Sequence, residues 1–180
     1  MKNFLYFLLI VALVACKNDE RVIIDTKSQV EKSKFYKEAV VQQGGDFLGL
    51  ILGEEFETAS KILPTVLPAD ITTEEDENFL YYRLEHIYTV TEYQLFFDNN
   101  KLEEINFDAI VYNEKGAFDE NGAIELFNDL KDDFIKFYGN KYMTSSDEDN
   151  EILFWNKGNK NVQLILEKAK VHVYLDIALK

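Results

Sequence analysis

The sequence predicts an α+β fold in which two units, each a helix followed by three strands, come one after the other along the chain. We expect each helix to pack on an antiparallel meander sheet. Two segments carry apolar residues at three- and four-residue steps, and several others alternate apolar and polar residues at period two. The same order of elements occurs twice. Strict alternation is typical of a sheet with one buried and one solvent-facing side.

The first unit is predicted at residues 44–113. It opens with an apolar stretch at 47–53, which we expect to be a short buried strand. A helix then runs from about Glu54 to Leu63, and Pro64 and Pro68 are expected to end it because proline cannot continue a helical hydrogen-bond ladder. An acidic loop and three strands complete the unit, at residues 74–78, 79–82, 87–97 and 102–112.

The second unit is predicted at residues 114–180. Its helix runs from about Gly122 to Tyr138, with capping residues at 119–121 and a glycine, Gly139, just after its end. An acidic loop and three strands follow, at residues 147–151, 152–155, 162–166 and 171–179. The two sheets either fuse into one or lie side by side, and the sequence leaves both arrangements open.

Adjacent aromatic residues occur in both units, with one ring of each pair expected to face the core. The other ring either forms a binding face or lies at the seam between the units, and we favour the seam. The pairs are Tyr81–Tyr82, Phe96–Phe97 and Phe154–Trp155.

No catalytic pattern is present in the sequence. The two histidines, His86 and His172, each fall in a predicted strand, where a solvent-facing side chain is a commoner role than a base or a ligand. The loop at 147–151 has alternating carboxylates but lacks the glycine of a calcium-binding EF-hand loop, so we expect a solvated acidic turn. Weak calcium binding through two or three of its carboxylates is the alternative. We therefore predict no catalytic residues, no metal, no cofactor and no enzymatic activity.

The composition is strongly acidic, with 33 Asp and Glu against 19 Lys and Arg and a formal net charge of −14. Such a surface disfavours nucleic acid, which is bound through clustered Lys and Arg. Such charge can steer basic proteins or cations toward the chain, but it also keeps exported domains soluble, and we favour the second interpretation. The partner we expect is a protein, and a basic protein is the narrower form of that expectation. The single cysteine excludes disulfides within the chain.

The N-terminus has the pattern of an export signal. Lys2 precedes an unbroken apolar run, Phe4 to Ala15, which suits a signal peptide and is short for a membrane-spanning helix. The residues Leu13, Val14, Ala15 and Cys16 resemble a lipobox, the recognition site of lipoprotein signal peptidase. This resemblance implies that residues 1–15 are removed and that Cys16 is acylated, for example with palmitate, as a membrane anchor. The alternative is an incidental cysteine in an ordinary signal peptide.

The residues after the lipobox add an expectation about location. Lys17, Asn18, Asp19 and Glu20 resemble the basic-then-acidic export tag of Bacteroidetes-type lipoproteins, although Asn18 interrupts the usual order. The resemblance implies the outer membrane, on either its periplasmic or its surface face. A solvated charge run is the alternative. Residues 16–43 would then be the lipidated cysteine and a tether, with a helix or half-ordered stalk at 28–43.

Together these features predict a lipid-anchored lipoprotein of the cell envelope that acts as a non-catalytic binding or assembly module. A narrower form is an inhibitor or immunity-like protein whose target is basic. The binding surface would be the wet sheet face or the acidic loops. The alternative function is a small carboxylate-dependent hydrolase of the envelope, because two of the many acidic residues could converge in the fold.

Overall fold

The computed structural model describes residues 45–66, 71–76, 78–86 and 88–180, which all belong to one compact unit, Ala39–Lys180. The predicted signal peptide, lipobox, export tag and tether lie outside the described residues. The α+β class is confirmed, because this part of the chain forms one large antiparallel sheet and two α-helices.

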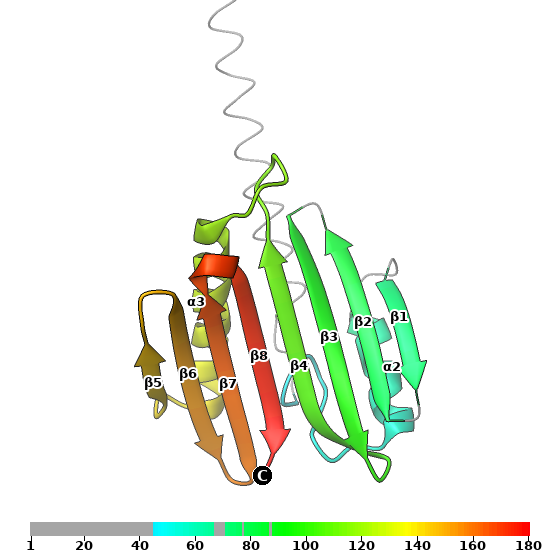
Figure 1. The fold of residues 1–180 in the computed structure, drawn as a ribbon. Helices are drawn as coiled ribbons and strands as arrows, with labels where there is room; N and C mark the ends of the chain where they lie inside the picture. Colours follow the sequence, from blue (N-terminus) through cyan, green and yellow to red (C-terminus); the bar gives the residue numbers. More distant parts are fainter. Residues whose placement is uncertain (1–44, 67–70, 77, 87) are drawn as a thin grey trace, which may run out of the picture. The chain divides into compact units, whose positions relative to one another are not determined.

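The eight strands form a single sheet in the order β1-β2-β3-β4-β8-β7-β6-β5 (Figure 1). The last strands of the two halves, β4 and β8, pair with each other in the middle of the sheet. The sequence left open whether the two halves form one sheet or two, and they form one. The strands are β1 Ile71–Asp76, β2 Phe79–His86, β3 Thr89–Asp98, β4 Lys101–Val111, β5 Met143–Ser146, β6 Asn150–Lys157, β7 Lys160–Glu167 and β8 His172–Leu179.

Each half contributes one helix followed by four strands, so the predicted three-strand unit lacks one strand in each half. In the first half the additional strand is β1, which contains part of the segment predicted as an acidic loop. In the second half it is β5, whose four side chains are all exposed. Both strands lie at the edges of the sheet. An edge strand exposed on both faces has no need of apolar alternation, which is why the pattern does not reveal it.

Helix α2 spans Phe56–Val66 and contains Pro64 in its last turn, so the prediction that Pro64 ends the helix is wrong. A proline at this position leaves the carbonyl oxygen of Ser60 without its helical donor. The hydroxyl of Tyr82 on β2 donates to that oxygen at 3.3 Å. A tertiary contact therefore compensates for the missing hydrogen bond.

Helix α3 spans Glu120–Tyr138, close to its predicted bounds. The carboxylate of Asp119 accepts the backbone N–H of Gly122 at 3.1 Å, and Gly139 follows the helix with a φ of 95°. Its buried face packs on β4, β7 and β8. The residues of that face are Gly122, Ala123, Leu126, Phe127, Leu130, Phe134 and Tyr138.

The segment at 47–53 is a buried loop, so its prediction as a strand is wrong. Phe47 and Leu50 form only an isolated bridge, and Gly45, Gly49 and Gly53 all have positive φ. Glycine adopts this conformation without steric cost, and the chain therefore turns repeatedly. The loop still buries its apolar side chains except that of Ile51. The ring of Phe47 packs on Tyr93, Phe107 and Phe134.

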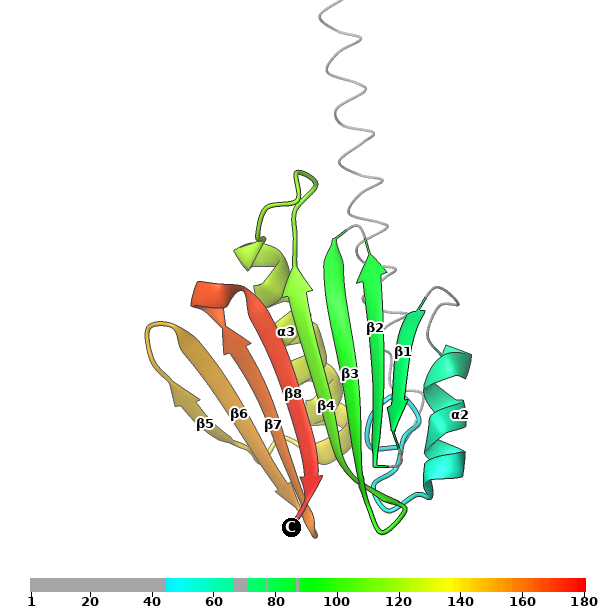
Figure 2. The same cartoon turned by 45° about the vertical axis from the view of Figure 1, so that its right-hand side comes forward.

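The core lies on one side of the sheet, where α2, α3 and the loop at 45–53 cover it. Figure 1 shows both helices behind the sheet, and the turned view of Figure 2 brings α2 into sight beside β1. Side chains alternate along β3 and β4 between fully buried positions on this face and partly exposed positions on the other. No helix among the described residues covers the other side, which we call the open face.

Candidate functional site

The open face is hollowed over its middle strands. A hollow of about 680 Å³ is lined by residues of β3, β4, β8, β7 and β6. Five carboxylates contribute to its lining, and none of the described lining residues is Lys or Arg. We call it the acidic hollow, and its carboxylates belong to Glu92, Glu104, Asp108, Glu167 and Asp176.

Strand register decides which of these groups meet. Asp108 on β4 lies directly opposite Glu92 on β3 and opposite Tyr174 on β8. Two residues away on β4, Asn106 lies directly opposite Gln94 on β3 and Asp176 on β8. Directly opposed side chains on one face of a sheet are contact neighbours, so residues distant in sequence form one polar surface.

Burial shifts the ionisation of two carboxyl groups in the hollow. The pKa of Asp108 is raised, mainly by burial and further by the carboxylates of Glu92 and Glu167, while His172 acts in the opposite direction. Burial also raises the pKa of Asp176, and Glu104 adds to the effect. Both carboxyls therefore hold a proton more readily than free Asp, because desolvation disfavours the charged form.

Three buried oxygens in the hollow have no hydrogen-bond partner within the described part of the chain. They are Oδ1 of Asn106, Oδ1 of Asp108 and Oδ1 of Asp176. Buried acceptors are normally satisfied, and leaving one unpaired costs free energy. Because the two carboxylate oxygens are also closed to solvent, their lack of a donor adds to the cost of ionising Asp108 and Asp176.

Two cations lie at the margin of this surface, and one of them is the ammonium of Lys170, which is 2.9 Å from Oε1 of Glu167. The guanidinium of Arg83 on β2 is 2.6 Å from Oε1 of Glu92 and 2.9 Å from Oε1 of Glu85. It offsets part of the negative charge at one end of the face. The carboxylates of Asp108 and Asp176 have no such ion pair with Lys or Arg among the described residues.

His172 lies on the open face, opposite the buried side chains of Val171 and Val173, as predicted. Its side chain is only 18% exposed, so it is more enclosed than a solvent-facing histidine. Nδ1 of His172 is 2.7 Å from the hydroxyl of Tyr174 and 3.4 Å from Oδ1 of Asp108. His86 ends β2, and its side chain lies outside the described residues.

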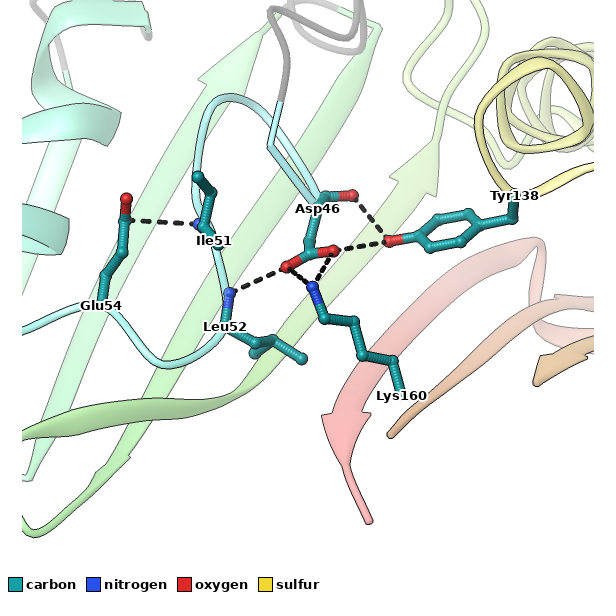
Figure 3. Close-up of polar contacts among 6 residues, drawn as sticks. All are labelled: Asp46, Ile51, Leu52, Glu54, Tyr138 and Lys160. Carbon is teal, nitrogen blue, oxygen red and sulfur yellow. Dashed lines mark hydrogen bonds and ion pairs between the residues drawn. The ribbon is translucent and has the colours of Figure 1, made fainter. Parts of the chain in front are cut away.

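A second charged cluster is internal (Figure 3). The carboxylate of Asp46, in the buried loop, accepts hydrogen bonds from the ammonium of Lys160, at 2.6 and 2.7 Å, and from the backbone N–H of Leu52, at 2.8 Å. The hydroxyl of Tyr138 donates to the backbone carbonyl of Asp46 at 3.1 Å, and burial followed by the charge of Asp46 raises the pKa of that hydroxyl. Because its donors and acceptors satisfy one another, this cluster holds the fold together and offers nothing to a ligand.

The aromatic pairs alternate as expected, but they do not form the seam between the halves. Tyr82, Phe97 and Trp155 are buried under the helices, and their neighbours lie on the open face of β2, β3 and β6. The seam is the backbone pairing of β4 with β8. The prediction of an aromatic seam is therefore wrong.

The sequence reasoning singled out none of the five carboxylates of the acidic hollow, although Asn150, in the predicted acidic loop, also lines it. A signal was present, since β4 places Glu104, Asn106 and Asp108 at alternate positions between buried residues. The sequence does not predict the strand order, which places these three side chains beside Asp176 and Glu167. An acidic turn lies between β5 and β6, but it is shorter than predicted, because Asn150 and Glu151 already belong to β6. In it Asp147 accepts the backbone N–H groups of Asp149 and Asn150.

The described residues show neither a metal-binding cluster nor a helix that could span a membrane. No group of three or more His, Cys, Asp or Glu side chains among them is arranged to hold a metal ion. No helix in this part of the chain has both the length and the apolar character needed to cross a membrane.

Comparison with protein-family models, with curated proteins and with solved structures finds no match to the chain.

Proposed function

We propose that this protein is a lipoprotein of the cell envelope that acts as a non-catalytic binding module, and that its acidic hollow binds a basic segment of a partner protein. The observation that carries the proposal is the composition of the hollow: five carboxylates and no Lys or Arg among its described lining residues. Such a surface attracts a cationic partner and repels an anionic one.

The details of the hollow match the side chains of a basic segment. The carboxylates of Asp108 and Asp176 line the hollow and form no ion pair with Lys or Arg among the described residues. A Lys or Arg side chain of the partner would supply that cation, and hydrogen bonds between charged groups are among the strongest in proteins. Ile152 and Ile165 line the same hollow. Their apolar surface suits the aliphatic stems of Lys and Arg, which pack on apolar groups while the charged head reaches a polar partner.

The anchor is the second part of the proposal. Acylation of Cys16 would hold the binding module on the outer membrane, at its periplasmic or its surface face, and the acidic residues would meet a basic protein that arrives there. An inhibitor or immunity-like protein fits this arrangement, because neutralising a basic effector requires an acidic complementary surface near its point of entry.

A defined basic probe tests the hollow directly. The full-length chain in detergent would be titrated with a lysine-rich peptide by calorimetry, with a glutamate-rich peptide of the same length as the negative probe. The double variant Glu104→Gln, Asp176→Asn is expected to bind the basic peptide about tenfold or more weakly, roughly 1.4 kcal/mol or more.

The control variant is Glu103→Gln, Glu148→Gln, which removes the same charge from exposed positions outside the hollow. It should bind nearly as well as the wild-type chain. Equal weakening in both variants would mean that only the overall negative charge attracts the peptide, and the proposed site would be wrong.

One observation supports the alternative of a small carboxylate-dependent hydrolase. Glu92 and Asp108 lie directly opposite each other, and the pKa of Asp108 is raised, as a general acid requires. Hydrolysis of a cell-wall glycan that is lost in Asp108→Asn and kept in Asp176→Asn would establish this function. Peptide binding without any turnover would favour the binding module.

A further inference from the structure

Asp108, His172 and Tyr174 form a compact titratable cluster at the wall of the acidic hollow. Nδ1 of His172 faces two oxygens from neighbouring strands, the hydroxyl of Tyr174 at 2.7 Å and Oδ1 of Asp108 at 3.4 Å. One ring nitrogen thus lies between a hydroxyl, which both donates and accepts, and a carboxylate, which only accepts when it is ionised.

The carboxylate is the incomplete member of this cluster. Oδ1 of Asp108 is buried and has no hydrogen-bond donor among the described residues, and its distance of 3.4 Å from His172 is long for a hydrogen bond. The pair becomes an ion pair only when the imidazole carries a second proton. A proton added between the two residues would therefore satisfy a buried acceptor that otherwise stays unpaired.

The charged neighbours on every adjoining strand favour that proton. From β3, Glu92 lies directly opposite Asp108, and Arg83 on β2 is paired with Glu92. From β7, Glu167 lies directly opposite His172, and its carboxylate pairs with Lys170. Two carboxylates thus flank the cluster from opposite sides, and each of them is paired with one cation. With the carboxylate of Asp108 between them, the local potential still favours a positive charge.

We propose that Asp108 and His172 together bind one proton from solvent, so that acidification makes the acidic hollow less negative by one charge. The proton comes from water and forms either an imidazolium–carboxylate pair or a neutral acid beside a neutral ring. The added proton is shared by the two residues, whether or not a partner occupies the hollow.

The direction in which the pKa of Asp108 shifts agrees with this arrangement. Burial raises the pKa of its carboxyl, with Glu92 and Glu167 acting in the same direction and His172 in the opposite one. His172 is thus the group through which the cluster favours an ionised Asp108 beside a charged ring. Removing the ring should leave a carboxyl that holds its own proton more tightly.

Nuclear magnetic resonance of the full-length chain in detergent tests the proposal. The carboxyl carbon of Asp108 and the ring nitrogens of His172 would be followed from pH 4 to 8. In the wild-type chain both residues should report the same steps. In His172→Gln the midpoint of Asp108 should move up, and in Glu92→Gln it should move down, because a neighbouring negative charge is removed.

Asp176→Asn is the matched control, a carboxyl on the same face that is not opposite either residue of the pair. It should leave the Asp108 curve nearly unchanged. Separate steps for the two residues in the wild-type chain, or an Asp108 midpoint that does not move in His172→Gln, would overturn the proposal. The wild-type measurement stands even if a variant fails to fold.

Discussion

Lys160 and Asp46, separated by 114 positions in the sequence, form a buried ion pair in which the ammonium lies 2.6 and 2.7 Å from the two carboxylate oxygens (Figure 3). The side chain of Asp46 is only 5% exposed. The pair connects the buried loop at 45–53 to β7. Tyr138 adds a contact from α3, so three parts of the fold meet at one carboxylate.

Replacing Lys160 with Met should lower the free energy of unfolding by about 3 kcal/mol, because it leaves the charge of Asp46 buried without its cation. Urea denaturation followed by the fluorescence of Trp155, the single tryptophan, would measure the loss. Lys61→Met is the control, since the ion pair of Lys61 with Glu57 is exposed and screened by water. A loss no larger than in the control would show that the buried pair is not stabilising.

Gly45→Ala should destabilise the protein far more than Gly116→Ala. Both glycines have nearly the same positive φ, 72° and 73°, so each substitution pays about 1–2 kcal/mol for a left-handed alanine. At Gly45 the new methyl group would also collide with the carbonyl of Leu50 and the backbone of Gly49, whereas nothing lies within 4 Å at Gly116. The collision should add about 1–3 kcal/mol.

Thermal and urea unfolding of the two glycine variants would measure this difference. Equal losses would mean that the loop at 45–53 shifts freely to admit a side chain. That result would contradict its close packing against the core.

Asp108→Asn should make stability less dependent on pH. The folded chain holds a proton on Asp108 at a higher pH than the unfolded chain does, because the folded pKa is raised from 3.8. The free energy of unfolding therefore falls as the pH rises from the unfolded value through the folded one. The variant should gain stability over the wild-type chain at pH 7, and the gain should shrink on acidification.

Asp147→Asn should show the opposite sign. The backbone N–H groups of Asn150 and Asp149 lower the pKa of Asp147, so its contribution is present above its unfolded pKa and is lost as the pH falls through the folded one. Urea unfolding at several pH values between 2 and 7 would compare the two variants. Parallel pH profiles in both would contradict the assigned directions.

Cys16→Ala should release the protein from the membrane fraction, because the lipid would have no thiol to attach to. Fractionation of cells and immunoblotting would measure it. Lys17→Ala is the control, since it keeps the acylated residue and should stay membrane-bound. A Cys16→Ala protein that remains on the membrane would contradict the proposed anchor.

Sequence patterns were sufficient for elements whose signal is local. The apolar stripe of α3, with Asp119 before it and Gly139 after it, predicts the helix nearly to its ends, because capping and periodicity depend on neighbouring residues. Alternation predicts β3, β4, β7 and β8, whose side chains are buried on one face. Alternation does not predict the edge strands β1 and β5, because a strand exposed on both sides carries no such pattern.

The sequence by itself thus determined the class of the fold, the central strands and the strong negative charge. The tertiary structure alone decided that β4 pairs with β8 and that Pro64 stays within a helix whose free carbonyl accepts the hydroxyl of Tyr82. It also decided that Glu92, Asp108 and Asp176 share one hollow. The physical reason is that strand order and register join residues far apart in the chain, and no local pattern encodes which strands will meet.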